Sequence, residues 1–325
     1  MKKIIILFSA ALLLAGCYDP YVIDYEVKGV CFANQVDIRS VVVGEGMRFS
    51  TAVVMGGMRD NDEDRAVTVA TDMTLLGDET LDAMKNNTMS YMQALTAGIG
   101  RLKLLPASNY SMKVEGGFPG VAVIPKGGHK GIIEIKIDSV AFLSGEDKLY
   151  PVYALPLRIT DPGSLTCIEG KETTVIGVHY ESMLFGNWWH GGVCRDDAGN
   201  ILSDYHLTIP EEDTRVWSLT TVAPFSLTAN AVAGELNGSA AQMELTLNPD
   251  NTVTVGSVPG ARFKVEPDGV SSFNAPVLLQ DRKLYLKYKF ERDGIVWHAS
   301  DTLVFRNRLR DGVNEWQDEN QSHYR

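Results

Sequence analysis

The chain has 325 residues, of which 45% are hydrophobic, and it carries a formal net charge of −11 at pH 7. This length favours two domains, each able to bury a core of its own. The acidic balance excludes nucleic acid as a partner and excludes charge-driven adsorption to anionic lipid, because both require clustered Lys and Arg.

The first residues have the pattern of a lipoprotein export signal. Two lysines precede an apolar run over 4–14, and small residues then lead to Cys17. The run is too short to span a bilayer, and its flanks are typical of a cleaved signal. We therefore predict a signal peptide over 1–16, lipidation of Cys17 and a tether over 17–24.

The other three cysteines are Cys31, Cys167 and Cys194. Three is an odd number, so at most one disulfide can form. A bridge between Cys31 and Cys167 stays open, although buried, unpaired thiols are the favoured interpretation. No zinc spacing is present, and we expect neither a metal nor a cofactor.

The segment over 25–177 has the pattern of a β domain. A heptapeptide at 59–65 spaces its acids like the opening of a calcium loop, but Arg65 stands where that loop needs Gly, so a solvated turn is predicted. One helix is expected over 79–96. Alternating or apolar runs predict strands at 25–32, 38–43, 46–55, 66–72, 131–138 and 153–160.

The segment over 178–325 shows strands without intervening helices, a pattern typical of a sandwich or barrel. Turn residues at 248–251 and 291–294 predict hairpins. The opening Gly186-Asn187-Trp188 and the repeated hairpins are similar to a lipocalin-like barrel. Strands are expected at 215–221, 242–247, 252–255, 262–265, 283–290 and 295–299.

Several longer motifs carry a family resemblance. "LKLLPASNY", "VAVIPKGGHKGIIEIKI" and "YPVYALPLRITD" follow one another in the first domain. They resemble the N-terminal domain of unknown function of many Bacteroidetes outer-membrane lipoproteins, which implies an immunoglobulin-like sandwich. "LFGNWWHGG" and "DTLVFRNRLRDGVNEWQDEN" resemble the C-terminal domain that accompanies it. The resemblance implies a setting beside SusC/SusD-type transporters and glycan handling at the cell surface, without an agreed activity.

The predicted fold is therefore all-β. It consists of an immunoglobulin-like sandwich over 25–177, followed by an antiparallel barrel or sandwich over 178–325, with a lipocalin-like barrel as one form.

A glycan binder needs aromatic faces beside a few polar groups. All five Trp lie in the second domain. Consecutive Trp188 and Trp189 would point to opposite faces of a strand, so at most one can join the core. The candidate ligand-binding residues are Trp188, Trp189, His190, Trp217 and Trp297.

No catalytic residue is predicted. Hydrolysis of a glycosidic bond needs two placed carboxylates, and the acids over 315–319 have the pattern of a polar tail. Neither a Gly-x-Ser-x-Gly elbow nor a His-Glu-x-x-His stretch occurs. The basic run over 306–311 is expected to end a strand, with its arginines paired to Asp301, Asp311 and Asp318. A contact with an acidic sugar or a partner protein is the alternative.

Two short segments match a three-residue pattern for O-glycosylation in exported Bacteroidetes proteins. These segments are Asp138-Ser139-Val140 and Asp301-Thr302-Leu303, so Ser139 and Thr302 are the candidate positions.

Together these patterns predict a membrane-anchored, non-catalytic lipoprotein that binds or helps handle carbohydrate. We expect it in the outer membrane, exposed at the cell surface, with a glycan ligand, a SusC/SusD-type complex as partner and no nucleic acid. One alternative is a fimbrial subunit that matures by cleavage after Arg39 and begins at Ser40. A glycosidase is the weaker alternative.

Overall fold

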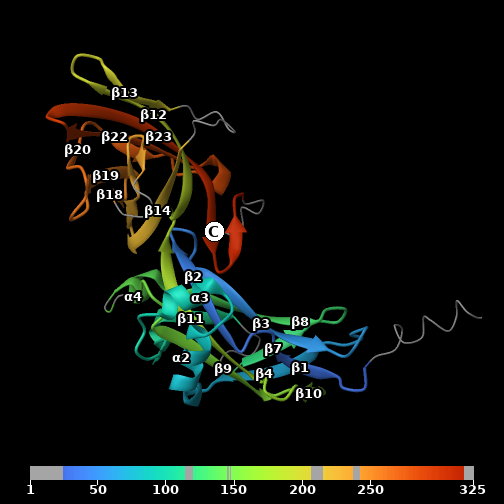
Figure 1. Cartoon of the computed structure of the whole chain (residues 1–325). Coiled ribbons are helices and arrows are strands. Elements are labelled where there is room, and N and C mark those ends of the chain that lie inside the picture. The colour runs from blue at the N-terminus through green and yellow to red at the C-terminus, as the bar shows by residue number, and fades with distance from the viewer. Residues whose placement is uncertain are drawn as a thin grey trace, which may run out of the picture.

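The structure is a computed structural model, and it describes residues 25–113, 120–144, 146, 148–205, 215–236 and 242–317. Strands make up 54% of it and helices 11%, so the predicted all-β class is confirmed. The chain forms two bodies, a sandwich below and a barrel above it in Figure 1. The predicted signal peptide and Cys17 lie outside the described residues.

The first body is a sandwich of two sheets. One sheet has the order β10-β1-β3-β8-β6, and the other has the order β2-β11-β9-β4-β7 with β5 beside β9. The core between them explains the alternation along the chain, since Ile133 and Ile135 of β8 are fully buried while Ile132 is exposed. The strands are β1 (Gly29–Phe32), β2 (Val36–Val43), β3 (Arg48–Gly56), β4 (Arg65–Thr71), β5 (Lys103–Leu104), β6 (Tyr110–Lys113), β7 (Gly120–Ile124), β8 (Lys130–Ile137), β9 (Tyr153–Asp161), β10 (Thr166–Cys167) and β11 (Thr173–Ser182).

The predicted single helix over 79–96 is wrong, because the segment forms two helices. Asn86 ends the first of them, and the side chain of Asn87 accepts a hydrogen bond from the Met89 N–H. Asn competes with the helix for such local hydrogen bonds, which explains the break. The helices are α2 (Asp78–Lys85), α3 (Ser90–Thr96) and α4 (Ser139–Leu143), and the 3-10 turns are η2 (Met73–Leu75), η3 (Ala107–Asn109) and η4 (Leu279–Asp281).

The second body is a closed antiparallel barrel. Its ring runs β12-β14-β15-β18-β19-β21-β22-β23, and pairing of β12 with β23 closes it. Neighbours in the ring follow one another along the chain, which is the up-and-down arrangement expected of a lipocalin-like barrel. The strands are β12 (Gly186–Asp196), β13 (Ile201–Tyr205), β14 (Arg215–Ala223), β15 (Ser226–Ala229), β16 (Ala231–Val232), β17 (Glu235–Leu236), β18 (Met243–Leu247), β19 (Thr252–Ser257), β20 (Val265–Pro267), β21 (Ser271–Phe273), β22 (Lys283–Arg292), β23 (Ile295–Arg310) and β24 (Val313–Glu315).

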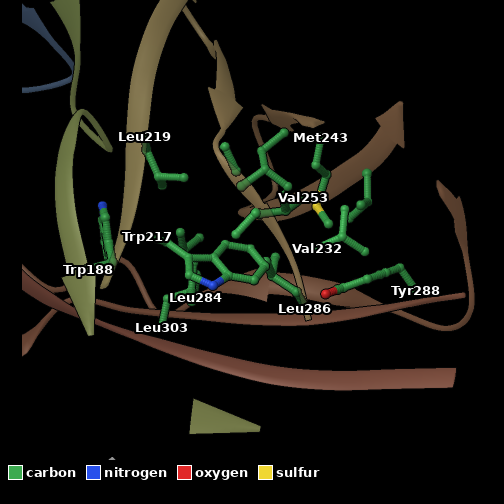
Figure 2. Packing of buried hydrophobic residues seen from close by; sticks show 14 of the residues in the cluster. Trp188, Trp217, Leu219, Val232, Met243, Val253, Leu284, Leu286, Tyr288 and Leu303 are labelled. Atoms are coloured by element: carbon green, nitrogen blue, oxygen red, sulfur yellow. The ribbon is translucent and has the colours of Figure 1, made fainter. Parts of the chain in front are cut away.

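Side chains fill the barrel interior. Trp188 and Trp217 are fully buried, and Figure 2 shows the Trp217 indole among the leucines of β22 and β23. An eight-stranded barrel has an interior just wide enough to be packed in this way. The described interior is therefore a core.

The two bodies meet where β11 of the sandwich leads into β12 of the barrel. β11 ends at Ser182 and β12 begins at Gly186, so the expected division between residues 177 and 178 falls inside β11. Gly186 has a φ of +130°, and a Cβ on it would lie 2.7 Å from the Asn307 carbonyl oxygen. Only glycine fits this crossing without strain.

Cys31, Cys167 and Cys194 are all free thiols. The interpretation of unpaired thiols is therefore confirmed, and burial is confirmed for Cys31 and Cys194, whereas Cys167 is only partly buried. The open bridge between Cys31 and Cys167 does not form.

Candidate functional site

Strand β12 separates the predicted ligand-binding residues. Trp188 and His190 point into the barrel and are 0% and 1% exposed, whereas Trp189 lies partly exposed on the outside. Trp217 on β14 and Trp297 on β23 also face inward and are buried. Buried rings cannot stack on a sugar in this conformation, so Trp189 is the candidate that a ligand can reach.

The inward-facing residues include a polar cluster. The Tyr288 hydroxyl donates to one carboxylate oxygen of Asp301 at 2.5 Å and accepts from the Ala233 N–H at 2.6 Å. His190 Nε2 lies 3.0 Å from the other Asp301 oxygen, and the His190 ring stacks on Trp217 at 4.8 Å between centroids. The residues of the cluster come from β12, β14, β22 and β23 and from the short β16–β17 hairpin. The buried Asp301 carboxylate lies at its centre.

The sequence interpretation missed Gly192, on which this cluster depends. Gly192 lies directly opposite Asp301 in the pairing of β12 with β23. A Cβ at Gly192 would overlap the Asp301 carboxylate and would lie 2.7 Å from the Ser300 carbonyl oxygen. The paired glycines at 191–192 were the only sequence signal that a neighbouring group approaches closely.

Burial keeps two groups near Asp301, Tyr288 and Cys194, protonated. The pKa of Tyr288 is well above its ordinary value because the hydroxyl is desolvated and faces the Asp301 charge. The same two causes raise the pKa of Cys194 to about 12. Cys194 is therefore a thiol at neutral pH and not a nucleophilic thiolate.

The outward side chains of three neighbouring strands form a second assembly, which we call the outer face. In the pairings, Trp189 is level with Val304, and Val304 is level with Lys283. Two residues further along, Gly191 is level with Thr302, and Thr302 with Tyr285. The outer face consists of Trp189, Gly191, Val193 and Arg195 of β12, Ser300, Thr302, Val304 and Arg306 of β23, and Lys283, Tyr285 and Lys287 of β22.

Two aromatic rings lie on the outer face with small residues between them. Tyr285 is 41% exposed, and the Arg306 guanidinium lies 4.7 Å from the centre of the Trp189 ring. The rings are two strands and two residues apart, which corresponds to roughly 12 Å at ~4.8 Å per strand and ~3.4 Å per residue. Ser300 and Thr302 lie on the strand between them and offer hydroxyl groups.

His298 lies at one end of the outer face and is paired with two carboxylates. His298 Nδ1 lies 2.7 Å from Asp268, and its Nε2 lies 3.1 Å from Asp197. The hydrogen bond with Asp268 is the main cause that raises the pKa of His298 above its ordinary value. Both neighbouring acids are thereby engaged at this end.

The two candidate O-glycosylation residues are accessible to different degrees. Ser139 is exposed at the first position of α4. The preceding residue, Asp138, caps this helix by accepting a hydrogen bond from the Ala141 N–H at 2.8 Å. Thr302 is partly exposed in the middle of the outer face. Modification of either residue stays a prediction.

The basic run over 306–311 has one of its expected partners, Asp311, together with two that were not expected, Glu45 and Glu315. Arg308 bonds Glu45 and Glu315, and Arg310 bonds Glu315 while lying 3.8 Å from Asp311. The expected pairing with Asp301 is wrong, because that carboxylate faces the barrel interior. Asp318 lies outside the described residues.

These arginines fasten the barrel to the sandwich. The Glu45 carboxylate, from the turn between β2 and β3, accepts from Arg282 at 2.6 Å and from Arg308 at 2.8 and 3.0 Å. Arg282 also donates to the Met183 carbonyl oxygen at 2.7 Å, in the connection between the two bodies. All three charged side chains are at most 6% exposed. We call this set the junction cluster.

A Ser, a His and an Asp also meet at the junction. The Ser40 hydroxyl donates to Asp311 at 2.7 Å and lies 3.0 Å from His179 Nε2. In a nucleophilic triad the histidine stands between the serine and the acid. Here the serine stands between the other two, so Asp311 does not hold the His179 ring as a general base for the serine proton. Within the described residues, no group of three or more His, Cys, Asp or Glu is placed to hold a metal ion.

The start of the chain is similar to that of known lipoproteins. Residues 1–17 match the model of a prokaryotic membrane lipoprotein lipid attachment site. The chain is a membrane-anchored lipoprotein. Among the helices that the structure describes, none combines the length and the apolar character needed to cross a membrane.

Residues 24–165 of the lipoprotein match a family model described as "-like, N-terminal domain". A crystal structure of a protein of unknown function from Bacteroides ovatus is similar with a TM-score of 0.59 and 19% identity, covering 91% of this chain and 98% of that one. That likeness supports the fold of both bodies together. A second Bacteroides ovatus protein of unknown function gives a TM-score of 0.43 at 15% identity, covering 90% of this chain and 98% of that one.

A Bacteroides ovatus multidomain protein including DUF1735 gives a TM-score of 0.40 at 15% identity, covering 88% of this chain and 99% of that one. No curated protein matches the lipoprotein.

Proposed function

We propose that this lipoprotein binds carbohydrate at the bacterial surface with the outer face of its barrel, and that it does so without catalysis. The observation that carries the proposal is the placement of Trp189 and Tyr285 on one side of a sheet, with serine and threonine hydroxyls between them. Aromatic rings supply the flat apolar surface that covers a sugar ring, and hydroxyls orient its polar groups.

The rigidity of the strands that carry the outer face supports its assignment as the binding surface. The outer face is carried by β12, β22 and β23, which pair over most of their length. Binding to a surface that is already ordered avoids the entropic cost of arranging loops around the ligand. A polysaccharide can extend over an open sheet in both directions, which a closed interior does not allow.

The test is binding by the detergent-solubilised mature lipoprotein, measured by isothermal titration calorimetry against a panel of polysaccharides. The double variant Trp189→Ala/Tyr285→Ala should bind at least about tenfold more weakly, which corresponds to ~1.4 kcal/mol. Trp316→Ala is the matched control, because Trp316 is 57% exposed but lies outside the outer face. Equal binding by the double variant and the unchanged protein would refute the assignment to this face.

The cellular setting belongs to the same proposal. A lipid at Cys17 in the outer membrane would hold the outer face at the cell surface, where a SusC/SusD-type complex could receive the glycan. Protease treatment of intact cells should degrade the lipoprotein, whereas a periplasmic control protein should survive. Protection of both proteins would place the lipoprotein inside the envelope and contradict surface display.

The fimbrial alternative has a direct test. Arg39 lies within β2, its guanidinium bonds Asp37 at 2.7 Å, and the next residue bonds Asp311. N-terminal analysis of cell-derived protein should give an acylated Cys17 for the anchored binder. A start at Ser40 would favour the fimbrial subunit, and sugar release from a bound glycan would favour a glycosidase.

A further inference from the structure

The outer face is rich in positive charge although the chain as a whole is acidic. Lys283 and Lys287 on β22, Arg306 on β23 and Arg195 on β12 are all exposed, while the chain carries a net charge of −11. Within the described residues, the side chains of Lys283, Lys287 and Arg195 form no ion pair. The Arg306 guanidinium lies over the ring of Trp189 and, in the part of the chain that the structure describes, forms no ion pair.

We propose that the ligand of the outer face is an anionic glycan, whose carboxylate or sulfate groups are bound by these cations. This inference rests on the proposed carbohydrate-binding function and names the chemical class of the sugar.

The spacing along β22 fits a charged sugar polymer. Lys283, Tyr285 and Lys287 alternate with buried residues, so their side chains follow one another on the outside at ~6.8 Å intervals. A sugar ring stacked on Tyr285 would have a lysine ammonium group on either side along the strand. Lysine and arginine make charge-assisted hydrogen bonds to carboxylate and sulfate oxygens, which are stronger than bonds between neutral groups.

Arg306 is placed for a second anionic group. Its guanidinium lies over the Trp189 ring, and its planar fork can hold both oxygens of a carboxylate or sulfate. A ring that stacks beside Trp189 would therefore meet a cation at the same position. Since the rest of the chain is acidic, a polyanion is repelled elsewhere and attracted to the outer face.

Three acids near this charge are already paired, and a fourth, Asp204 of β13, is level with Val193 on the opposite side of β12 from the lysines of β22. Asp268 and Asp197 both bond His298, which lies at one end of the outer face. Glu266, at the same end, bonds Lys264 at 2.6 Å and lies 3.9 Å from Lys289. The two lysines that flank Tyr285 along β22 and the arginine over Trp189 are thus left for a ligand.

The experiment compares charged glycans with neutral forms of the same backbone, using the detergent-solubilised mature lipoprotein. Polygalacturonate is paired with its methyl ester to test carboxylate, and dextran sulfate is paired with dextran to test sulfate. Calorimetry should detect binding of at least one charged member, at least about tenfold tighter than its neutral form, and this binding should weaken as salt is added. Tighter binding of a neutral form, or no effect of salt, would overturn the inference but leave carbohydrate binding standing. Binding of no glycan at all would remove the proposed function as well.

Charge-reversal variants locate the attraction. Lys283→Glu and Lys287→Glu should together weaken binding of the charged glycan by at least about tenfold. Lys130→Glu/Lys136→Glu is the matched control, because both lysines are exposed on outward positions of β8 in the sandwich and the change in net charge is the same. All four positions are exposed, so thermal unfolding should be unchanged. An equal loss in the control would show that net charge alone attracts the polymer, which would contradict a site on the outer face.

Discussion

Gly192 supports the barrel interior by lacking a side chain. The Asp301 carboxylate occupies the position that a Cβ would take, and the Ser300 carbonyl oxygen lies 2.7 Å from that position. Because Asp301 binds Tyr288, displacement of the carboxylate would leave buried polar groups unpaired. Such groups cost about 1–3 kcal/mol each.

The substitution Gly192→Ala should therefore lower the free energy of unfolding by about 2–4 kcal/mol. Denaturant unfolding followed by circular dichroism measures the change. Gly256→Ala on β19 is the control, since nothing lies within 4 Å of the position that its added methyl group would take. A loss at Gly192 no larger than the loss at Gly256 would contradict the role assigned to Asp301.

The two tryptophans of β12 show how far the sequence predicts the candidate site. Period-two alternation correctly predicts that Trp188 and Trp189 point to opposite faces of β12. It cannot tell which of the two enters the core, because both are equally apolar and the closing partner, β23, lies more than 100 residues later. Tyr285, Lys283 and Lys287 were assigned to a strand, but only the ring closure brings them beside Trp189.

At the element scale, β11 carries two titratable groups with opposite effects on stability. Burial lowers the pKa of His179 to about 4, and burial raises the pKa of Glu181 to about 7. Between pH ~6.5 and ~4, the unfolded state binds the His179 proton more readily, so acidification destabilises the fold. Between pH ~4.5 and ~7, the folded state binds the Glu181 proton more readily, so a rise in pH destabilises the fold. The two effects oppose each other over the interval that they share.

The substitution Glu181→Gln should separate these effects. Glutamine keeps a partner for the Thr221 hydroxyl, which lies 3.1 Å from the Glu181 carboxylate, and it carries no charge. The variant should be more stable than the unchanged protein at pH 8, by about 1–3 kcal/mol, and similar to it at pH 4.5.

Thermal unfolding at a series of pH values provides the measurement for this variant. Glu169→Gln serves as the control, because Glu169 is an exposed carboxylate in a turn, and its curve should superimpose on that of the unchanged protein. A Glu181 variant that is no more stable at pH 8 would show that this carboxylate is not desolvated in solution.

Element boundaries were predictable only where the cause is local. The Asp293-Gly294 turn has φ angles of +55° and +75°, as an Asp-Gly hairpin requires, and the hairpin between β22 and β23 was predicted. The length of β23 was not. It runs from Ile295 to Arg310, although the part beyond the predicted end at Ala299 contains Asp301 and the arginines. Tyr288 and Glu45 compensate those charges, and Glu45 is 263 positions from Arg308.

At the scale of the whole molecule, the junction cluster couples the two bodies. Glu45 lies between two arginines that are themselves almost fully buried. Removal of one partner from a buried ion pair typically costs 3–5 kcal/mol, because the remaining charges stay desolvated. We therefore expect the junction cluster to make sandwich and barrel unfold in a single transition.

The substitution Glu45→Ala should lower the free energy of unfolding by about 3–5 kcal/mol. It should also split a single calorimetric transition into two, with sandwich and barrel melting separately. Glu134→Ala is the control, because its ion pair with Lys113 is exposed and 3.6 Å long, and such pairs contribute at most ~1 kcal/mol. One unchanged transition in the Glu45 variant would mean that other contacts couple the bodies.

Strand β23 has a mechanical consequence. Figure 1 shows the strand in the barrel above the sandwich. This strand carries Arg306 on the outer face and, two residues later, Arg308 in the junction cluster. If a polymer bound at Arg306 is pulled away from the sandwich, the load acts on β23 along its own axis. Its hydrogen bonds to β12 and β22 lie across that direction and would share the load, whereas a hairpin pulled from its tip breaks one bond at a time. The force would then pass through Arg308 into the sandwich and on towards the lipid, so that under the proposed function the barrel would keep its strands paired while a bound polymer is pulled.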